Sequence, residues 1–213
     1  KTSEERFRSL IENSSDLICV LNKQGIITYE SPSVTRILGY KSEQRIGQSI
    51  YNYMPDGDIP QIKEIISEII HKKNISMRFE GRFKHQDGTV RIFDIACKNS
   101  LSDPSIKGII LNSRDITQRK ESEDELYRTN SLMTKVFDNI PVTIFLKEVE
   151  NLRYVKFNQA GLELMGLSLD DFLGKTDFEI FPKSQARDLV KDDRVTLQQD
   201  EVLEIPQQPI QTR

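Results

Sequence analysis

Residues that build metal and disulfide sites are scarce in this sequence. Its 213 residues include two cysteines, two histidines and no tryptophan. Cys19 and Cys97 lie far apart in separate apolar stretches, which is the spacing of neither a disulfide framework nor a metal site. Free cysteines are typical of a reducing compartment, so we expect a cytoplasmic location and no bound metal.

Long hydrophobic runs and an excess of charge of one sign are also missing. No stretch reaches the ~18 apolar residues that a membrane span needs, so we expect no membrane contact in this segment, although the parent protein could be anchored elsewhere. The 30 basic and 33 acidic residues are well mixed, which argues against a nucleic-acid partner. Because the chain starts at Lys1 rather than Met, we expect it to be part of a longer protein.

What the sequence does contain is one pattern twice. Gly39, Gly47 and Pro55 each recur 127 positions later, at 166, 174 and 182, and the apolar residues between them keep the same spacing. Glycines matched in this way mark backbone positions that a side chain would hinder. The chain therefore holds two copies of one domain, with one extra residue in the 148–152 turn of the second.

Hydrophobic periodicity predicts the elements of the first copy. After an N-terminal helix, five segments have the composition or alternation of strands: 16–21, 26–29, 75–83, 93–98 and 108–113. Short helices precede Pro60, where a longer helix begins. An antiparallel five-stranded sheet with helices on one face is the natural packing, so the predicted fold class is α+β.

A hollow between this sheet and the helices is the candidate ligand site. Its predicted lining consists of Ile62, Ile65, Ile69, Met77, Phe79, Phe93, Ile95 and Cys97. A lining of aliphatic and aromatic side chains suits a small organic ligand. The alternative is that these side chains simply fill the space. A buried apolar cysteine is usually inert, so we expect Cys97 to serve in packing.

Between the copies lies a segment without glycine or proline, which predicts a connecting helix. Leu126, Met133 and Ile140 are seven residues apart, and Val136 falls at the intermediate position. Such spacing favours pairing with the same helix of a second chain, and we expect a parallel homodimer. The alternative is that the helix packs on its own domain, because two heptads are fewer than a confident coiled coil needs.

This interpretation divides the chain into three parts. They are a first domain over 1–117, a connecting helix over 118–139, and a second domain over 140–213. The second copy ends before any counterpart of 89–117, so we expect its sheet to be incomplete, with a third strand near 202–205.

These features resemble PAS domains, and the resemblance covers almost the whole chain. The matching segments are 13–18, 25–29, 37–40, 45–47 and 85–89 in the first copy, and 145–147, 157–161 and 173–177 in the second. The most specific is Asp115-Ile116-Thr117-Gln118-Arg119, which looks like the Asp-Ile-Thr-x-Arg motif that joins PAS domains to a signalling helix.

The resemblance implies a sensory and relay module of a larger bacterial or archaeal signalling protein. Its output domain would be a histidine kinase core, or less often a diguanylate cyclase, elsewhere in the same chain. We expect Asp115 and Thr117 to hydrogen-bond where the last strand becomes a helix, and Arg119 to pair with Asp115. An ordinary helix cap is the alternative. This segment has no kinase or cyclase signature, so we expect it to be non-catalytic.

The resemblance also suggests haem and flavin as cofactors, and the residues of this chain argue against both. Haem-binding PAS domains place a histidine in the long helix, where this chain has Ile62. Nothing matches the Asn-Cys-Arg-Phe-Leu-Gln segment of flavin-binding members. The cofactor is therefore left open, between a small organic ligand and a ligand-free module that only dimerises.

Overall fold

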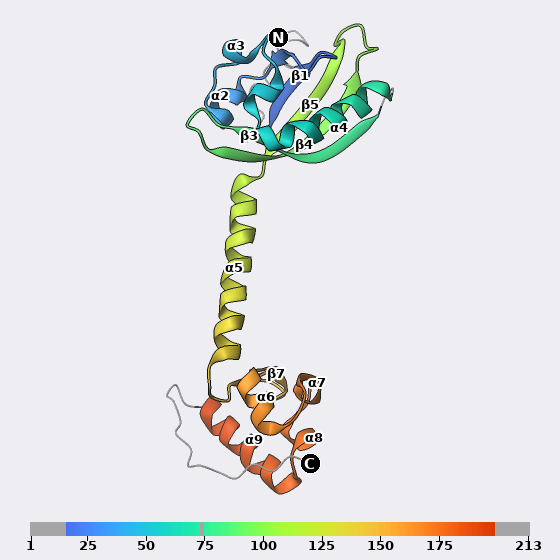
Figure 1. Ribbon diagram of the computed structural model, residues 1–213. Helices are drawn as coiled ribbons and strands as arrows, with labels where there is room; N and C mark the ends of the chain where they lie inside the picture. The colour runs from blue at the N-terminus through green and yellow to red at the C-terminus, as the bar shows by residue number, and fades with distance from the viewer. Residues whose placement is uncertain (1–15, 73–74, 199–213) are drawn as a thin grey trace, which may run out of the picture. The chain divides into compact units, whose positions relative to one another are not determined.

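The computed structural model describes residues 16–72 and 75–198 (Figure 1). Contacts between residues divide the chain into two compact units, Lys1–Glu125 and Leu126–Arg213. Helix α5 (Thr117–Asn139) covers the expected connecting segment. The partition into domains of 1–117 and 140–213 stays a prediction, and the expected N-terminal helix and the strand near 202–205 lie outside the described residues.

An antiparallel sheet of five strands forms one layer of the first unit. The strands are β1 (Leu17–Leu21), β2 (Ile27–Glu30), β3 (Ser76–Lys84), β4 (Val90–Ser100) and β5 (Gly108–Asp115). They lie in the order β2-β1-β5-β4-β3. Alternation explains the sheet's inner face, because Phe93, Ile95 and Cys97 of β4 are buried. The predicted α+β class with a five-stranded antiparallel sheet is confirmed.

The helices of this unit cover one face of the sheet (Figure 1). They are α2 (Ser33–Leu38), α3 (Ser42–Arg45), the short 3-10 helices Ile50–Tyr53 and Asp56–Asp58, and α4 (Ile59–His71). Helix α4 turns Ile62, Ile66 and Ile69 inward, as its spacing predicts. Helix α2 ends at Gly39, whose φ of 80° is the left-handed conformation that favours glycine.

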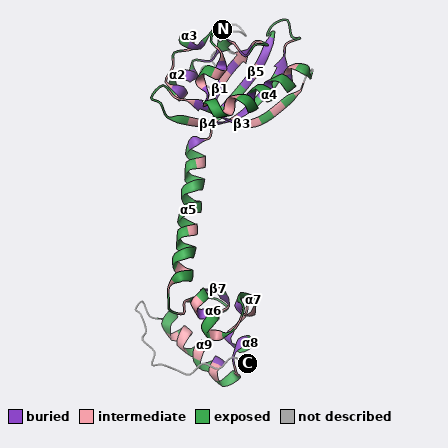
Figure 2. Ribbon diagram, in the orientation of Figure 1, coloured by how far each residue is buried: buried purple, intermediate pink, exposed green. Residues whose placement is uncertain are grey.

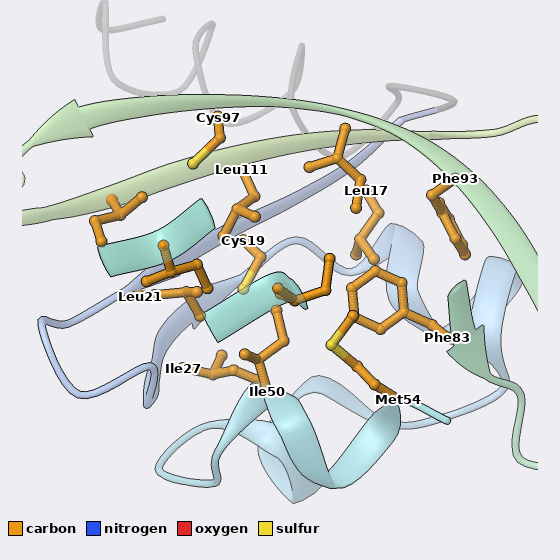
Figure 3. Close-up of a cluster of buried hydrophobic side chains, with 14 of the residues drawn as sticks. Leu17, Cys19, Leu21, Ile27, Ile50, Met54, Phe83, Phe93, Cys97 and Leu111 are labelled. Atoms are coloured by element: carbon orange, nitrogen blue, oxygen red, sulfur yellow. The ribbon is translucent and has the colours of Figure 1, made fainter. Parts of the chain in front are cut away.

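The core of the first unit lies between these two layers (Figure 2). In the close-up of Figure 3, Cys19 and Leu21 of β1 lie over Ile27 and Ile50, and Met54 lies farther along the same core. All five side chains are at most 3% exposed. The helical layer is therefore held to the sheet by continuous apolar packing.

Besides the C-terminal part of α5, the second unit has two antiparallel strands and four helices in its described part. These are β6 (Phe145–Lys147), β7 (Tyr154–Phe157), α6 (Gln159–Met165), α7 (Leu169–Phe172), α8 (Asp177–Ile180) and α9 (Lys183–Leu197). Tyr154, Phe157 and Phe172 form an aromatic core, with ring centroids 4.2 Å apart for the two phenylalanines. The two-stranded sheet agrees with the expectation of an incomplete second copy.

Both units repeat the same local geometry. Gly47 has φ of 84° and donates its N–H to the carbonyl of Ile27 at 2.8 Å. Gly174 has φ of 74° and donates to the carbonyl of Tyr154, also at 2.8 Å. The helix that precedes each glycine, α3 or α7, has four residues. Each residue in this region can therefore be compared with its counterpart in the other copy.

Candidate functional site

The junction between β5 and α5 is built around Thr117. Its N–H and its hydroxyl both donate to Asp115 Oδ1, at 2.8 and 2.6 Å. The hydroxyl also accepts the N–H of Ile92 in β4, at 2.8 Å. The N–H of Ile116 donates to the carbonyl of Ile92 at 2.9 Å. Because Thr117 is buried, the first residue of α5 is tied to two strands rather than to solvent.

Arg119 does not join this junction, and the expected pair with Asp115 is wrong. Its Nε donates instead to Glu123 Oε1 at 2.7 Å, and its side chain is 75% exposed. The reason is helical geometry, since a residue four positions along lies on the same face of a helix. The neighbouring Lys120 makes the contact that sequence reasoning missed, with its Nζ 2.8 Å from Glu80 Oε1 in β3.

The eight side chains of the predicted hollow do come together between α4 and the sheet. Five are buried in the core: Ile62, Ile69, Phe93, Ile95 and Cys97. The others, Ile65, Met77 and Phe79, are partly buried and pack against it. Burial raises the pKa of the Cys97 thiol to about 12, which keeps it protonated and unreactive at neutral pH. This arrangement is the one expected if the side chains fill their own space.

A pocket of about 310 Å³ lies elsewhere, between the start of α4 and the middle of β3. It is lined by Asp58, Gln61, Ile62, Glu80, Gly81, Arg82 and Ile92, so only Ile62 belongs to the predicted set. Arg82 binds Asp58 through two hydrogen bonds of 2.8 and 2.6 Å, and these lower the pKa of that carboxyl. The sequence signal for this pocket was Gly81, a glycine inside a strand.

Sequence reasoning also missed a buried ion pair in the first unit. Glu30 and Arg45 are 3% and 1% exposed, and Glu30 Oε2 lies 3.1 Å from Arg45 Nε. The guanidinium carbon is 4.1 Å from the ring centroid of Tyr53 and 5.4 Å from that of Tyr40. Burial raises the pKa of Glu30 to about 7, although Arg45 acts to lower it.

The second unit buries a different charged cluster. Lys147 Nζ lies 2.8 and 2.7 Å from the two carboxylate oxygens of Asp177, and 2.7 Å from Asp193 Oδ2. The hydroxyl of Tyr154 donates to Asp177 Oδ1 at 2.8 Å. Burial and the neighbouring carboxylate raise the pKa of Tyr154. Asp177 is fully buried, so its charge is balanced inside the domain.

The first copy fills the corresponding positions with aliphatic residues. Lys147 pairs with Tyr154 across β6 and β7, in the register that Leu21 and Ile27 have across β1 and β2. In order, the counterparts of Lys147, Tyr154, Asp177 and Asp193 are Leu21, Ile27, Ile50 and Ile66. All four counterparts belong to the hydrophobic core. The copies share a fold but bury charge at different places in it.

The apolar residues expected to pair two chains are exposed on α5 (Figure 2). Leu126 and Met133 are each 62% exposed and Val136 is 49% exposed, while Ile140, just beyond the helix, is partly buried. Of the residues in α5, only Thr117 is buried. Residues 121–130 of α5 are exposed, whereas Lys120 contacts the first unit and Phe137 contacts the second, so packing of the helix on its own domains is seen near its ends.

Asn158, which sequence reasoning did not single out, ties the C-terminal end of α5 to the second unit. Its Nδ2 donates to the carbonyls of Phe137, Ile140 and Val142, at 3.1, 3.3 and 2.8 Å. Its Oδ1 accepts the N–H groups of Ile144 and Gly161. Asn158 is fully buried, so this helix is anchored at its C-terminal end as well as at its start.

Two family models, both described as PAS fold, match residues 5–116 and 137–210 of the chain. The chain belongs to the PAS family. The resemblance found in the sequence is therefore confirmed for both copies.

Relatives of this PAS chain include named kinases and sensors. Sporulation kinase C of Bacillus subtilis is 25% identical over 142 residues, which cover 66% of this chain and 32% of the kinase. Sensor protein FixL of Bradyrhizobium diazoefficiens is 26% identical over 141 residues, covering 64% and 27%. The chain thus spans about a third or less of each relative. These matches agree with the expected sensory module of a signalling protein.

Solved PAS domains have a similar fold. The PAS domain of an HTR-like protein from Haloarcula marismortui has a TM-score of 0.48 and 24% identity, covering 54% of this chain and 97% of that one. A PAS domain from Colwellia psychrerythraea has a TM-score of 0.49 and 23% identity, covering 55% and 99%.

Two further observations concern metals and membranes. Among residues 16–72 and 75–198, no three histidine, cysteine, aspartate or glutamate side chains are grouped so that they could hold a metal ion. None of the helices described has the length and hydrophobicity to span a membrane.

Proposed function

We propose that this chain is a cytoplasmic sensory, relay and dimerisation module that regulates a histidine kinase core elsewhere in the same protein. The observation that carries the proposal is the junction at Thr117, which binds the first turn of α5 to the sheet of the first PAS domain. The names of the kinase and sensor relatives support the same function.

The junction explains how a change in the first domain would reach α5. Thr117 is bonded to Asp115 at the end of β5 and to Ile92 in β4. Lys120, one turn along α5, contacts Glu80 in β3. A shift of these strands would therefore displace the start of the helix instead of being absorbed by a loose connection. The helix would carry that displacement toward the output domain.

Exposed apolar residues on α5 support the dimerisation part of the proposal. Leu126, Met133 and Val136 lie on the helix, and Ile140 continues their spacing just beyond its end. We call these four residues the α5 stripe. Full burial of one such side chain contributes about 1.5–3 kcal/mol, so pairing of two stripes would hold two chains together. In this proposal the chain itself catalyses no reaction, and phosphotransfer belongs to the output domain.

One observation favours a second candidate, a ligand-free module that relays and dimerises. The side chains of the predicted hollow pack into one core, as they would if no ligand entered it. In that case the first domain transmits a structural change that arises elsewhere in the protein.

The relay can be tested with Asp115→Ala in the full-length protein. We expect the autophosphorylation rate of the kinase core to change at least fivefold, because Asp115 accepts hydrogen bonds from both the N–H and the hydroxyl of Thr117. Asp124→Ala, an exposed aspartate in the same helix, is the matched control and should leave the rate unchanged. If circular dichroism shows both variants folded and their rates equal that of the wild type, the relay proposal is wrong.

A further inference from the structure

The Glu30–Arg45 pair occupies positions at which the second copy carries no charge. Glu30 and Phe157 are the last residues of β2 and β7, and Arg45 and Phe172 are the last residues of α3 and α7. In the second copy the two aromatic rings pack with their centroids 4.2 Å apart. The fold therefore does not need an ion pair at this place. At these two positions, buried charge occurs in the first domain and not in the second.

This pair is also poorly satisfied. Although Glu30 Oε2 and Arg45 Nε lie 3.1 Å apart, their geometry does not make a hydrogen bond. Among the described residues, neither carboxylate oxygen of Glu30 has a hydrogen-bond partner, and neither Nε nor Nη1 of Arg45 has one. Burying two charges repays its desolvation cost only when geometry is good and the remaining hydrogen bonds are made. A buried carboxylate in this situation lowers its free energy by taking up a proton.

Among the titratable groups packed around Glu30, Glu30 itself is the one expected to change its charge near neutral pH. Cys19 faces it from β1, and burial raises the pKa of that thiol beyond the physiological range. Tyr53, from the 3-10 helix, also has a raised pKa, and the ring of Tyr40, with its centroid 5.2 Å from that of Tyr53, lies near Arg45 as well. Arg45 is a guanidinium, a group that is not deprotonated in proteins. The carboxyl group of Glu30, with its pKa raised to about 7, is thus poised to titrate among fixed neighbours.

We propose that Glu30 is a proton-binding site of the first PAS domain, and that its protonation near neutral pH releases Arg45 and with it helix α3. When the carboxyl group loses its proton to solvent, the carboxylate holds the guanidinium by charge. When it regains the proton, Arg45 keeps its charge and retains only the faces of Tyr53 and Tyr40. Helix α3 is four residues long, and the only buried side chain in it is that of Arg45. Losing this anchor therefore frees the helix.

A pH titration of the 213-residue chain by nuclear magnetic resonance tests both parts. We expect the side-chain carboxyl carbon of Glu30, assigned with Glu30→Gln, to titrate with a midpoint near 7. The backbone amides of Ser42–Arg45 should shift with the same midpoint. A Glu30 midpoint below 5, or α3 amides that do not follow it, would overturn the proposal.

A double variant provides the matched control. Glu30→Phe with Arg45→Phe gives the first copy the residues that already pack in the second, so it is expected to stay folded. It should abolish the α3 transition near pH 7 while leaving the amides of α9 unchanged. A transition that persists in this variant arises from another group and contradicts the assignment to Glu30.

Proton binding at Glu30 does not require the relay through α5. The use of that proton as a signal does, and so rests on the proposed function. In the full-length protein, Asp115→Ala should leave the Glu30 titration intact while removing any step in kinase activity between pH 6 and 8. Glu30→Gln should remove both. A missing titration defeats the proton site, an intact titration with no kinase step in the wild type defeats its use as a signal, and a kinase step that persists in Asp115→Ala defeats the relay.

Discussion

At the scale of single residues, the two PAS copies differ most in where they bury charge. The first holds Glu30 and Arg45, and the second holds Lys147 against Asp177 and Asp193. The two clusters are satisfied to different degrees. Lys147 has three carboxylate oxygens within 2.8 Å, whereas neither oxygen of Glu30 has a hydrogen bond among the described residues. The second cluster is therefore suited to stability and the first to a change of state.

The raised pKa of Glu30 predicts a specific dependence of stability on pH. Because the folded protein keeps this proton up to about pH 7 and the unfolded chain releases it near 4.5, the native state binds more protons in that window. The free energy of unfolding should fall by about 3 kcal/mol as pH rises from 4.5 to 7, at roughly 1.4 kcal/mol per unit of pKa shift, and then level off. Urea unfolding of the wild type and Glu30→Gln at pH 5 and pH 8 measures this contribution. Equal pH dependence in the two proteins would exclude it.

Removing Lys147 alone should destabilise the second unit strongly. Lys147→Met leaves the buried carboxylate of Asp177 without its counter-charge, which costs about 3–5 kcal/mol. The triple variant Lys147→Leu, Asp177→Ile and Asp193→Ile introduces the apolar residues of the first copy and should be far less damaging. Urea unfolding compares the two. A triple variant less stable than Lys147→Met would show that the cluster does more than balance its own charges.

At the scale of elements, α5 is defined by its two anchored ends rather than by packing along its length. Thr117 holds the start and Asn158 binds carbonyls at the C-terminal end. Between them the helix is exposed, and residues 121–130 have no buried side chain. Motion applied at one end can therefore be carried along the helix without being lost to contacts with either unit.

Thr117→Val tests the first of these anchors. Valine keeps the shape of threonine and the backbone N–H that donates to Asp115, but its side chain can neither donate to Asp115 nor accept the N–H of Ile92, so it should cost about 1–3 kcal/mol. Hydrogen exchange of the amides in the first turn of α5 should become at least fivefold faster. Thr134→Val, at an exposed position of the same helix, should leave the exchange unchanged. Unaltered protection of the first turn in Thr117→Val would mean that the hydroxyl is not the anchor.

The sequence allowed prediction of the elements whose signal repeats along the chain. The alternation around Phe93 and the spacing of Ile62, Ile66 and Ile69 identify β4 and α4, because several residues carry each pattern. The burial of a single charged residue is not announced by any repeating pattern in the sequence. Glu30 and Arg45 resemble surface positions in isolation, and their burial depends on packing between segments far apart. Comparison with Phe157 and Phe172 was the one sequence signal available for this pair.

Arg119 shows a different limit of sequence-based prediction. The motif Asp-Ile-Thr-x-Arg places Arg119 four residues after Asp115, but the helix begins only at Thr117. The rule that residues four apart share a helix face applies within a helix, so it joins Arg119 to Glu123 instead. The predicted helix start at 118 already left Asp115 outside the helix, so the expected pair applied the four-residue spacing where it does not hold.

At the scale of the whole molecule, the proposed dimer depends on the α5 stripe. Two heptads are short for an independent coiled coil, so each apolar contact should matter. Leu126→Glu with Met133→Glu places two charges on the stripe and should raise the dimer dissociation constant at least 100-fold, because each lost apolar contact is worth about 1.5–3 kcal/mol.

Tyr127→Glu with Thr134→Glu gives the matched control for the dimer. Both residues are exposed on α5, and they are seven apart, each one position after a residue of the stripe. This pair adds the same two charges to another face of the helix and should leave the dimer intact. Native mass spectrometry across a concentration series measures both variants and the wild type. A wild type that stays monomeric at high concentration would contradict pairing through the stripe. Equal dissociation of the two double variants would contradict it too, because net charge would then be the cause.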